Sequence, residues 1–81
     1  MFYVYILRSV KFGVYYVGCT KDIKKRLKLH NDGFAKSTQN KKPWELLYQE
    51  KYESLNEARQ RELKIKSWKR RSAIGKLISG R

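Results

Sequence analysis

Two tyrosines, one arginine and one histidine in the N-terminal part of the chain are spaced so that they could converge on one phosphate group. Tyr5 lies in an apolar run, and Tyr16 lies in a second run that follows a short turn. Such runs predict two neighbouring strands. Arg26 and His30 come next, one helical turn apart, and would share a helix face. A guanidinium matches phosphate oxygens and an ionised phenol can accept a proton, so the set favours phosphoryl chemistry.

The helical positions of Arg26 and His30 are unusual for charged side chains. At about 100° per residue, both fall on or beside the apolar stripe that contains Ile23 and Leu27. The lysines of this helix fall on other faces: Lys21, Lys24, Lys25 and Lys28. Two explanations stay open, because His30 could be a core histidine and Arg26 could pair with Asp22 one turn earlier.

A second helical pattern places one acid, Glu62, within its apolar stripe. The apolar positions of this stripe are Leu55, Ala58 and Ile65. A buried carboxylate is costly unless it is paired or bound to a metal ion. Either an ion pair with Arg59 or Lys66, or a divalent metal, would meet this requirement. The remaining strand and loop acids, Glu45, Glu50 and Glu53, are expected to be exposed, and Glu57 belongs to a helix cap.

The elements that must position these side chains predict one small α/β domain over residues 1–81. We expect a three-stranded antiparallel sheet flanked by helices, in the order strand, strand, helix, strand, helix, helix. The expected strands are residues 2–7, 14–17 and 44–52. The expected helices run from a cap at Thr20 or Asp22 to about Asn31, from Ser54 to about Lys66, and through a last segment that carries Trp68, Ile74, Leu77 and Ile78.

Several residues mark where these elements begin and end. Ser54 and Glu57 have the spacing of a capping box, and Gly33 is a stop signal for the first helix. Residues 34–43 form a polar, basic loop, with one helical turn expected near Phe34. Gly18 would let the backbone bend sharply or approach a ligand.

The composition indicates a polyanionic partner. The 81 residues carry 20 Lys and Arg against 7 Asp and Glu, a net charge of +13, and no acid follows Lys64. Such a patch favours nucleic acid over an anionic membrane, and no run approaches the roughly 20 apolar residues that span a bilayer. A single cysteine fits a reducing cytoplasm. The expected phosphate-contacting residues are Lys36, Lys41, Lys42, Lys66, Lys69, Arg70 and Arg71.

The tripeptides Tyr3-Val4-Tyr5 and Tyr16-Val17-Gly18 together resemble the signature of the GIY-YIG superfamily of metal-dependent DNA endonucleases. The domain of that superfamily is similar in length to this chain and has the same element order. The segment from Arg61 to Trp68 also resembles the short, stand-alone bacterial branch. The resemblance implies an active site at Tyr5, Tyr16, Arg26 and His30, with Glu62 as the metal ligand.

The resemblance implies Mg²⁺ or Mn²⁺ as cofactor, without a small-molecule cofactor, and hydrolysis of phosphodiester bonds in DNA. Glu62 would hold the ion, Arg26 would neutralise charge on the phosphoryl oxygens, and Tyr5 or Tyr16 would help to deprotonate water, with the choice between them open. A phenol with a pKa near ~10 would need a neighbouring charge or hydrogen bond to lower that value. Structure-specific or repair-related cleavage is one expectation, and RNA stays open as a partner.

The chain also departs from the pattern of the superfamily. Tyr3 stands in place of a glycine, Val4 and Val17 in place of isoleucines, Cys19 where some members have lysine, and Ile74 where several nucleases have asparagine. These departures keep a second hypothesis open: a basic nucleic-acid-binding domain that retains the fold without turnover.

Overall fold

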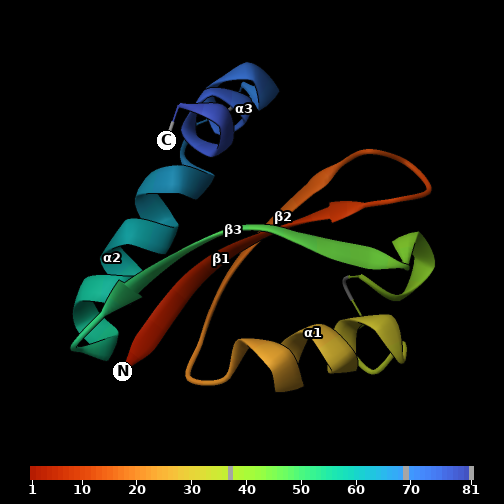
Figure 1. Cartoon of the computed structure of the whole chain (residues 1–81), viewed down its shortest axis with the longest axis horizontal. Helices are drawn as coiled ribbons and strands as arrows, with labels where there is room; N and C mark the ends of the chain where they lie inside the picture. Colours follow the sequence, from red (N-terminus) through yellow and green to blue (C-terminus); the bar gives the residue numbers. More distant parts are fainter. Residues whose placement is uncertain (37, 69, 81) are drawn as a thin grey trace.

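The computed structural model describes residues 1–36, 38–68 and 70–80 and contains three strands and three α-helices (Figure 1). In chain order the elements are β1 (Phe2–Ser9), β2 (Tyr15–Thr20), α1 (Ile23–Asn31), a short 3₁₀ helix η1 (Gln39–Lys41), β3 (Trp44–Tyr52), α2 (Leu55–Lys66) and α3 (Arg71–Ser79). This order and the antiparallel sheet confirm the fold class predicted from the sequence.

The sheet has the order β2-β1-β3, so β1 is the central strand. Its two pairings are antiparallel, with Tyr5 opposite Gly18 on β2 and opposite Gln49 on β3. The central place of β1 explains its continuous apolar run, because a strand that is covered on both faces needs apolar side chains at every position. Four consecutive residues from Val4 to Leu7 are at most 1% exposed.

Alternation along the strands divides the core between the two faces of the sheet. One cluster contains Val4, Ile6 and Val17 and packs against Ala58 and Ile65 of α2. The partly buried side chains of α3 (Ile74, Leu77 and Ile78) join this cluster. The other cluster contains Tyr5, Leu7 and Trp44 and packs against Ile23 and Leu27 of α1. Figure 1 shows α1 on one side of the sheet and α2 and α3 toward the other.

Local signals fix the helix ends as the sequence predicts. The Asp22 side chain caps α1 by accepting the backbone N–H of Lys25 at 3.1 Å, and Gly33 adopts a left-handed φ of 83° just after the helix. Ser54 caps α2 by accepting the backbone N–H of Glu57 at 3.2 Å. No helix within the described ranges has the length and apolar character needed to cross a bilayer.

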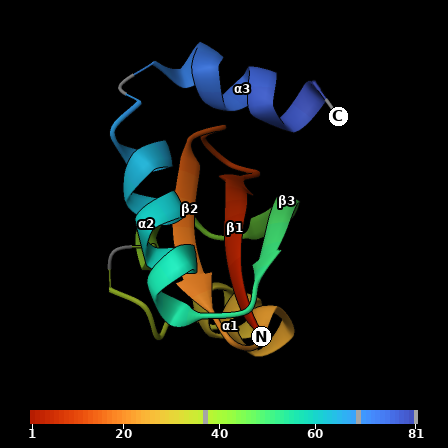
Figure 2. The ribbon, with the colours of Figure 1, turned by 90° about the vertical axis from the view of Figure 1, so that its left-hand side faces the viewer.

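Four boundary predictions are wrong in detail. β1 continues two residues beyond the expected end of the strand, to Ser9. β2 begins one residue later than expected and continues to Thr20, because its pairing with β1 extends to Tyr3. The helical turn in the basic loop is η1, nearer the C-terminal end of the loop than Phe34. Trp68 precedes α3 instead of lying within it, because α2 ends in a cap at Ser67 and α3 begins only at Arg71. Figure 2 shows α3 as a separate segment across the end of the sheet.

Candidate active site

Tyr5 on the central strand extends its ring across Gly18 of β2. A Cβ atom at Gly18 would overlap the hydroxyl of Tyr5 and lie 2.5 Å from its Cζ atom. The glycine therefore makes room for the phenol. The φ of Gly18 is outside the left-handed region, so the expectation of a sharp bend at this residue is wrong. Gly18, the last residue of the second tripeptide, thus leaves the space that the Tyr5 ring of the first tripeptide fills.

The Tyr5 hydroxyl lies 3.1 Å from Nε2 of His30, and both residues are 1% exposed. The other ring nitrogen of His30, Nδ1, lies 2.7 Å from the hydroxyl of Thr38. His30 therefore joins the central strand to the basic loop. The core-histidine explanation therefore holds for its burial, and its hydrogen bonds connect it both to Tyr5 in the core and to Thr38 in the basic loop.

The environment of Tyr5 does not favour its ionised form. Burial, together with the nearby Tyr16, raises the pKa of Tyr5 to about 12, and the interaction with Arg26 offsets only part of this effect. Arg26 thus lowers the pKa of Tyr5, as expected for a catalytic phenol, but burial outweighs it. Burial and the charge of Arg26 also lower the pKa of His30, which keeps its imidazole neutral at pH 7.

Tyr16 lies beside this pair and is more accessible. Its ring centroid is 4.9 Å from that of His30 and 6.4 Å from that of Tyr5. On the other side, the ring of Trp44 packs against it at 6.1 Å. Tyr16 is only partly buried, so its ring is held by three neighbours while part of the side chain remains accessible.

Arg26 is exposed on α1 and lines a cleft of about 270 Å³ at the N-terminal end of this helix. The alternative in which Asp22 holds Arg26 is not the arrangement found, because the Asp22 side chain accepts the backbone N–H of Lys25. The Arg26 guanidinium instead acts electrostatically on Tyr5 and opposes the effect of burial on its pKa. The buried Tyr5–His30 pair is thus influenced, at Tyr5, by the charge of a solvent-accessible side chain.

Glu62 lies on α2 and is 9% exposed. Its carboxylate pairs with Lys66 at 2.8 Å, so the ion pair considered for this acid is present. The charge of Glu62 also acts on Tyr5 and raises the pKa of Cys19 on β2, where burial is the larger cause. The acid therefore lies within electrostatic reach of Tyr5.

The donor set for a metal ion is small. Within the described ranges, no three His, Cys, Asp or Glu side chains form a metal-binding group. A single carboxylate fits Mg²⁺ or Mn²⁺ better than Zn²⁺, because these hard ions keep water ligands and accept phosphate oxygens. Lys66 would have to release Glu62 before an ion could bind there.

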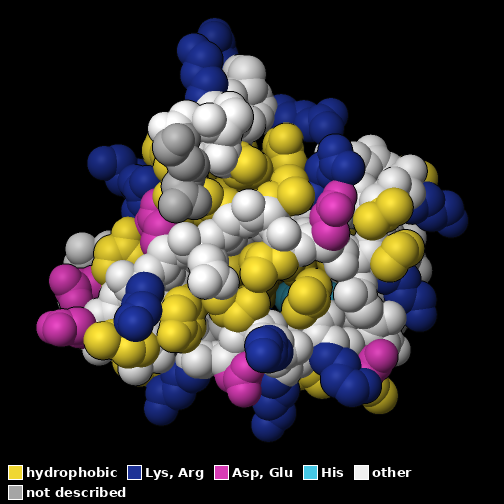
Figure 3. All heavy atoms as spheres, viewed as in Figure 1, with side chains coloured by type: hydrophobic (Ala, Val, Ile, Leu, Met, Phe, Trp, Pro, Cys, Tyr) yellow, Lys and Arg dark blue, Asp and Glu magenta, His cyan; other side chains and the backbone are white. Residues whose placement is uncertain are grey.

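The basic residues expected to contact phosphates differ in their exposure and in whether their charged groups already contact other residues. Lys36, Lys41, Lys42 and Arg70 are exposed, and dark-blue side chains surround the face shown in Figure 3. Lys66 is paired with Glu62. Arg71 donates to the backbone oxygen of Gly13 at 2.6 Å and lies over the Tyr15 ring at 5.2 Å. Lys69 lies outside the described residues. The basic loop is therefore the freest part of the predicted surface.

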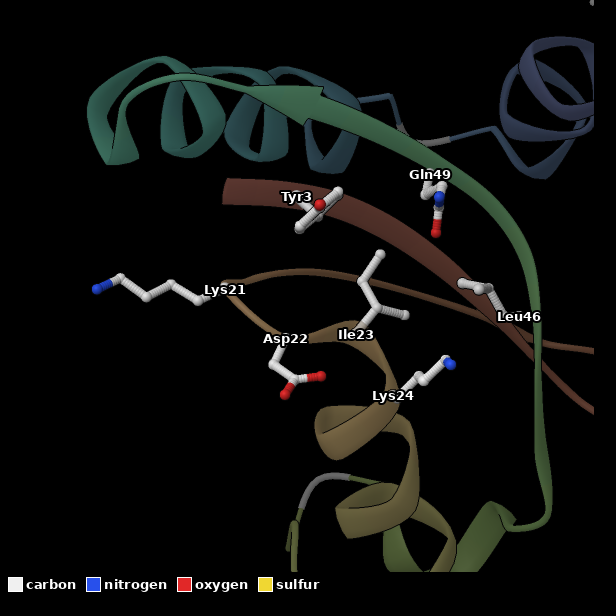
Figure 4. Close-up of a pocket in the computed structure, with 7 residues that line it drawn as sticks. All are labelled: Tyr3, Lys21, Asp22, Ile23, Lys24, Leu46 and Gln49. Carbon is white, nitrogen blue, oxygen red and sulfur yellow. The ribbon is translucent and has the colours of Figure 1, made fainter. Parts of the chain in front are cut away.

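A second cleft, of about 370 Å³, lies between α1 and the sheet (Figure 4). Tyr3, Leu46 and Gln49 line it from the strands, and Ile23 points toward them from α1. The lining excludes Tyr5, Tyr16, Arg26 and His30, although Lys21 and Asp22 line both clefts. The larger cleft is therefore separate from the predicted site.

Sequence reasoning missed two groups that hold the site in place. Thr38 is 1% exposed although it lies in a polar loop, and no periodicity marks it. Asn31 accepts the backbone N–H of Trp44 at 2.5 Å and donates to its oxygen at 3.1 Å, which joins the end of α1 to the start of β3. The position of Asn31 directly after His30 is the one feature of the sequence that could have indicated this contact.

Glu50 also differs from its expected exposure. Its side chain is 15% exposed and receives two hydrogen bonds from Arg61, at 2.9 and 3.0 Å. The hydroxyls of Tyr48 and Tyr52 donate to the same carboxylate. Burial alone would raise the pKa of Glu50, but these hydrogen bonds outweigh it and lower the pKa. This cluster fixes α2, and with it Glu62, against β3.

Comparison with known proteins places this arrangement in a family. A model of the GIY-YIG catalytic domain matches residues 1–76. A UPF0213 protein of Staphylococcus saprophyticus is 44% identical over 78 residues, which cover 95% of this chain and 93% of the relative. A UPF0213 protein of Bacillus pumilus is 41% identical over 85% of this chain and 70% of the relative. The solution NMR structure of a UPF0213 protein from Bacillus halodurans is 36% identical, with a TM-score of 0.61 over 98% of this chain and 84% of that one. The chain therefore belongs to the GIY-YIG family of nuclease domains.

Proposed function

We propose that this protein is a divalent-metal-dependent endonuclease that hydrolyses phosphodiester bonds in DNA. The observation that carries the proposal is the convergence of Tyr5, Tyr16, His30 and the Arg26 guanidinium on one side of the sheet. These groups come from three consecutive elements, β1, β2 and α1. A set that served only the core would not need an exposed guanidinium beside a buried phenol–imidazole pair.

Arg26 would bind the phosphoryl oxygens of the scissile phosphate. Its guanidinium is exposed at a cleft, and its planar donors match two oxygens at once. Charge that develops on these oxygens in the transition state would be stabilised by the same group. Its electrostatic interaction with the buried Tyr5 would favour this orientation of the guanidinium.

The two tyrosines would have different roles. With a pKa of about 12 and 1% exposure, Tyr5 is a poor proton acceptor and is suited to orienting Arg26 and His30. Tyr16 is the accessible phenol, and its ring is fixed by His30 and Trp44. We therefore assign the contact with the attacking water to Tyr16.

Glu62 would hold a Mg²⁺ or Mn²⁺ ion, displacing Lys66 from its carboxylate. Such an ion supplies Lewis-acid stabilisation of the leaving oxygen. Lys66 would then be free to approach a neighbouring phosphate. The exposed lysines of the basic loop would follow the DNA backbone without reading its sequence, which suits a substrate defined by its branched or damaged structure.

Arg26→Ala and Lys25→Ala test the proposal as a matched pair. The two residues are adjacent, exposed and cationic, but only Arg26 acts on Tyr5. We expect Arg26→Ala to reduce DNA cleavage by about 100-fold or more and Lys25→Ala to change it little. Both variants should retain the circular dichroism spectrum of the parent. Equal losses in the two variants would show that only net charge matters.

The Glu62–Lys66 ion pair favours a second candidate function, a nucleic-acid-binding domain without turnover. A carboxylate that stays neutralised by Lys66 would not recruit a metal ion. Lys66→Met separates the two functions, because removing the ammonium should raise the affinity of Glu62 for Mn²⁺ in a nuclease. In a binding-only domain, Mn²⁺ titration followed by isothermal calorimetry would detect no binding to either protein.

A further inference from the structure

Thr38 has an unusual position for a hydroxyl residue in a basic loop. It is 1% exposed, while Lys36, Lys41 and Lys42 around it are exposed. Its hydroxyl lies 2.7 Å from Nδ1 of His30 and 3.3 Å from the backbone oxygen of Ala35. One hydroxyl therefore contacts both the loop backbone and the ring that holds Tyr5.

The loop is fixed in this position by further hydrogen bonds. The Trp44 indole donates to the backbone oxygen of Thr38 at 2.9 Å, and the Ser9 hydroxyl donates to the backbone oxygen of Lys41 at 2.6 Å. Ser9 and Trp44 are themselves buried. Thr38 is thus held at the imidazole by the sheet, and its contact with His30 does not depend on the exposed lysines.

The loop end of this hydrogen-bonded chain determines the direction of every bond in it. The carbonyl of Ala35 can only accept, so the Thr38 hydroxyl donates to it and accepts from Nδ1 of His30. A neutral imidazole that is protonated at Nδ1 has a lone pair at Nε2, so Nε2 accepts and the Tyr5 hydroxyl, 3.1 Å away, donates.

We propose that Thr38 is a positioning residue that holds neutral His30 as the tautomer protonated at Nδ1, so that Nε2 accepts the proton of Tyr5. The chain of donors then runs from Tyr5 to His30, from His30 to Thr38, and from Thr38 to the Ala35 carbonyl. In this arrangement the lone pairs of the Tyr5 oxygen stay available to the guanidinium of Arg26, which acts on Tyr5 electrostatically. The effect on cleavage rests on the proposed nuclease function, whereas the tautomer itself does not.

The parent protein gives a direct test, because the chain contains one histidine. Nitrogen-15 NMR of uniformly labelled protein at pH 7.5 should show a protonated Nδ1 and an unprotonated Nε2 for this one ring. Protonation at Nε2, or a rapidly exchanging mixture of both tautomers, would overturn the proposal. This test needs no variant to fold and no substrate.

Thr38→Val and Thr38→Ser then test the role of the hydroxyl. Valine keeps the shape without a hydrogen-bonding group, and serine keeps the hydroxyl. We expect Thr38→Val to lose the fixed tautomer and to lower kcat by roughly tenfold, with little change in KM for DNA, as for other residues that orient a functional histidine. Thr38→Ser should restore both. If Thr38→Val keeps the parent tautomer and kcat, Thr38 is not a positioning residue. A fixed Nδ1–H tautomer in a parent that never cuts DNA would contradict the nuclease function and leave the tautomer assignment supported.

Discussion

Replacing Tyr5 with phenylalanine should mainly lower stability, whereas replacing Tyr16 with phenylalanine should mainly lower cleavage. Tyr5→Phe keeps the buried ring but removes the donor to Nε2 of His30, a bond of 3.1 Å between residues that are 1% exposed. A buried acceptor left unsatisfied costs about 1–3 kcal/mol. In a domain of this size, each kcal/mol lowers Tm by about 4–8 °C.

Tyr16→Phe removes a hydroxyl from a ring that is held by its faces and edges. The contacts with His30 at 4.9 Å and Trp44 at 6.1 Å do not involve the oxygen, so phenylalanine preserves them. We expect the free energy of unfolding to change by less than about 1 kcal/mol. Cleavage should fall by about 100-fold or more, because the phenol that contacts the attacking water is lost.

Urea denaturation and single-turnover cleavage of labelled DNA measure the two effects on the same preparations. The parent's cleavage rate should rise with pH in the neutral to alkaline range, as a phenol or metal-bound water loses its proton. DNA affinity in the presence of a chelator should be unchanged in both variants. The assignment of roles would be refuted if Tyr16→Phe were destabilised and active while Tyr5→Phe were stable and inactive.

Three further predictions concern the support of the site. Burial and Arg26 lower the pKa of His30 below its usual 6.5, so the neutral form adds to stability above pH 6.5. This contribution is lost as the pH falls below 6.5 toward the lower pKa of the folded state. Urea titrations at several pH values should show this decline in the parent and a weaker decline in His30→Asn. Gly18→Ala should destabilise the protein by about 1–3 kcal/mol in thermal denaturation, because the added Cβ overlaps the Tyr5 ring, and an unchanged Tm would mean that the ring can move aside. Neutralising the exposed Lys41 and Lys42 together should reduce the salt dependence of DNA affinity, with a slope smaller by about 2 in a plot of log K against log salt, and an unchanged slope would place the loop away from DNA.

The sequence predicts the architecture well because local and periodic signals agree in it. The apolar run of β1, the cap of α2 at Ser54 and the alternation of β2 around Tyr16 indicate three elements by three different physical rules, and all fit one fold. The helical angles of Arg26 and His30 also predict that they share one side of α1. Periodicity could not show that His30 is buried while Arg26 is exposed.

The contacts that sequence reasoning missed depend on three-dimensional proximity alone. Thr38 lies in a loop that has no repeating pattern, yet its hydroxyl contacts His30. Glu50 lies on β3 at a position expected to be exposed, yet its carboxylate accepts hydrogen bonds from Arg61 of α2. The start of α3 at Arg71 could not be predicted, because Trp68 fits the apolar pattern of this helix although it lies before it. In each case a hydrogen bond or cap determined the structure without changing the hydrophobic pattern.

Cleavage by the parent and by Glu62→Gln, as a function of metal concentration, tests the nuclease proposal most directly. The substrates are end-labelled flap, fork and single-stranded DNA and a supercoiled plasmid, each with Mg²⁺, Mn²⁺ or a chelator. The account predicts that the parent cuts at least one of them only with metal, and that Glu62→Gln is slower by about 100-fold or more while binding the same DNA equally well in chelator. A parent that cuts none of these substrates with either metal, or a Glu62→Gln variant that cuts as fast as the parent, would contradict it.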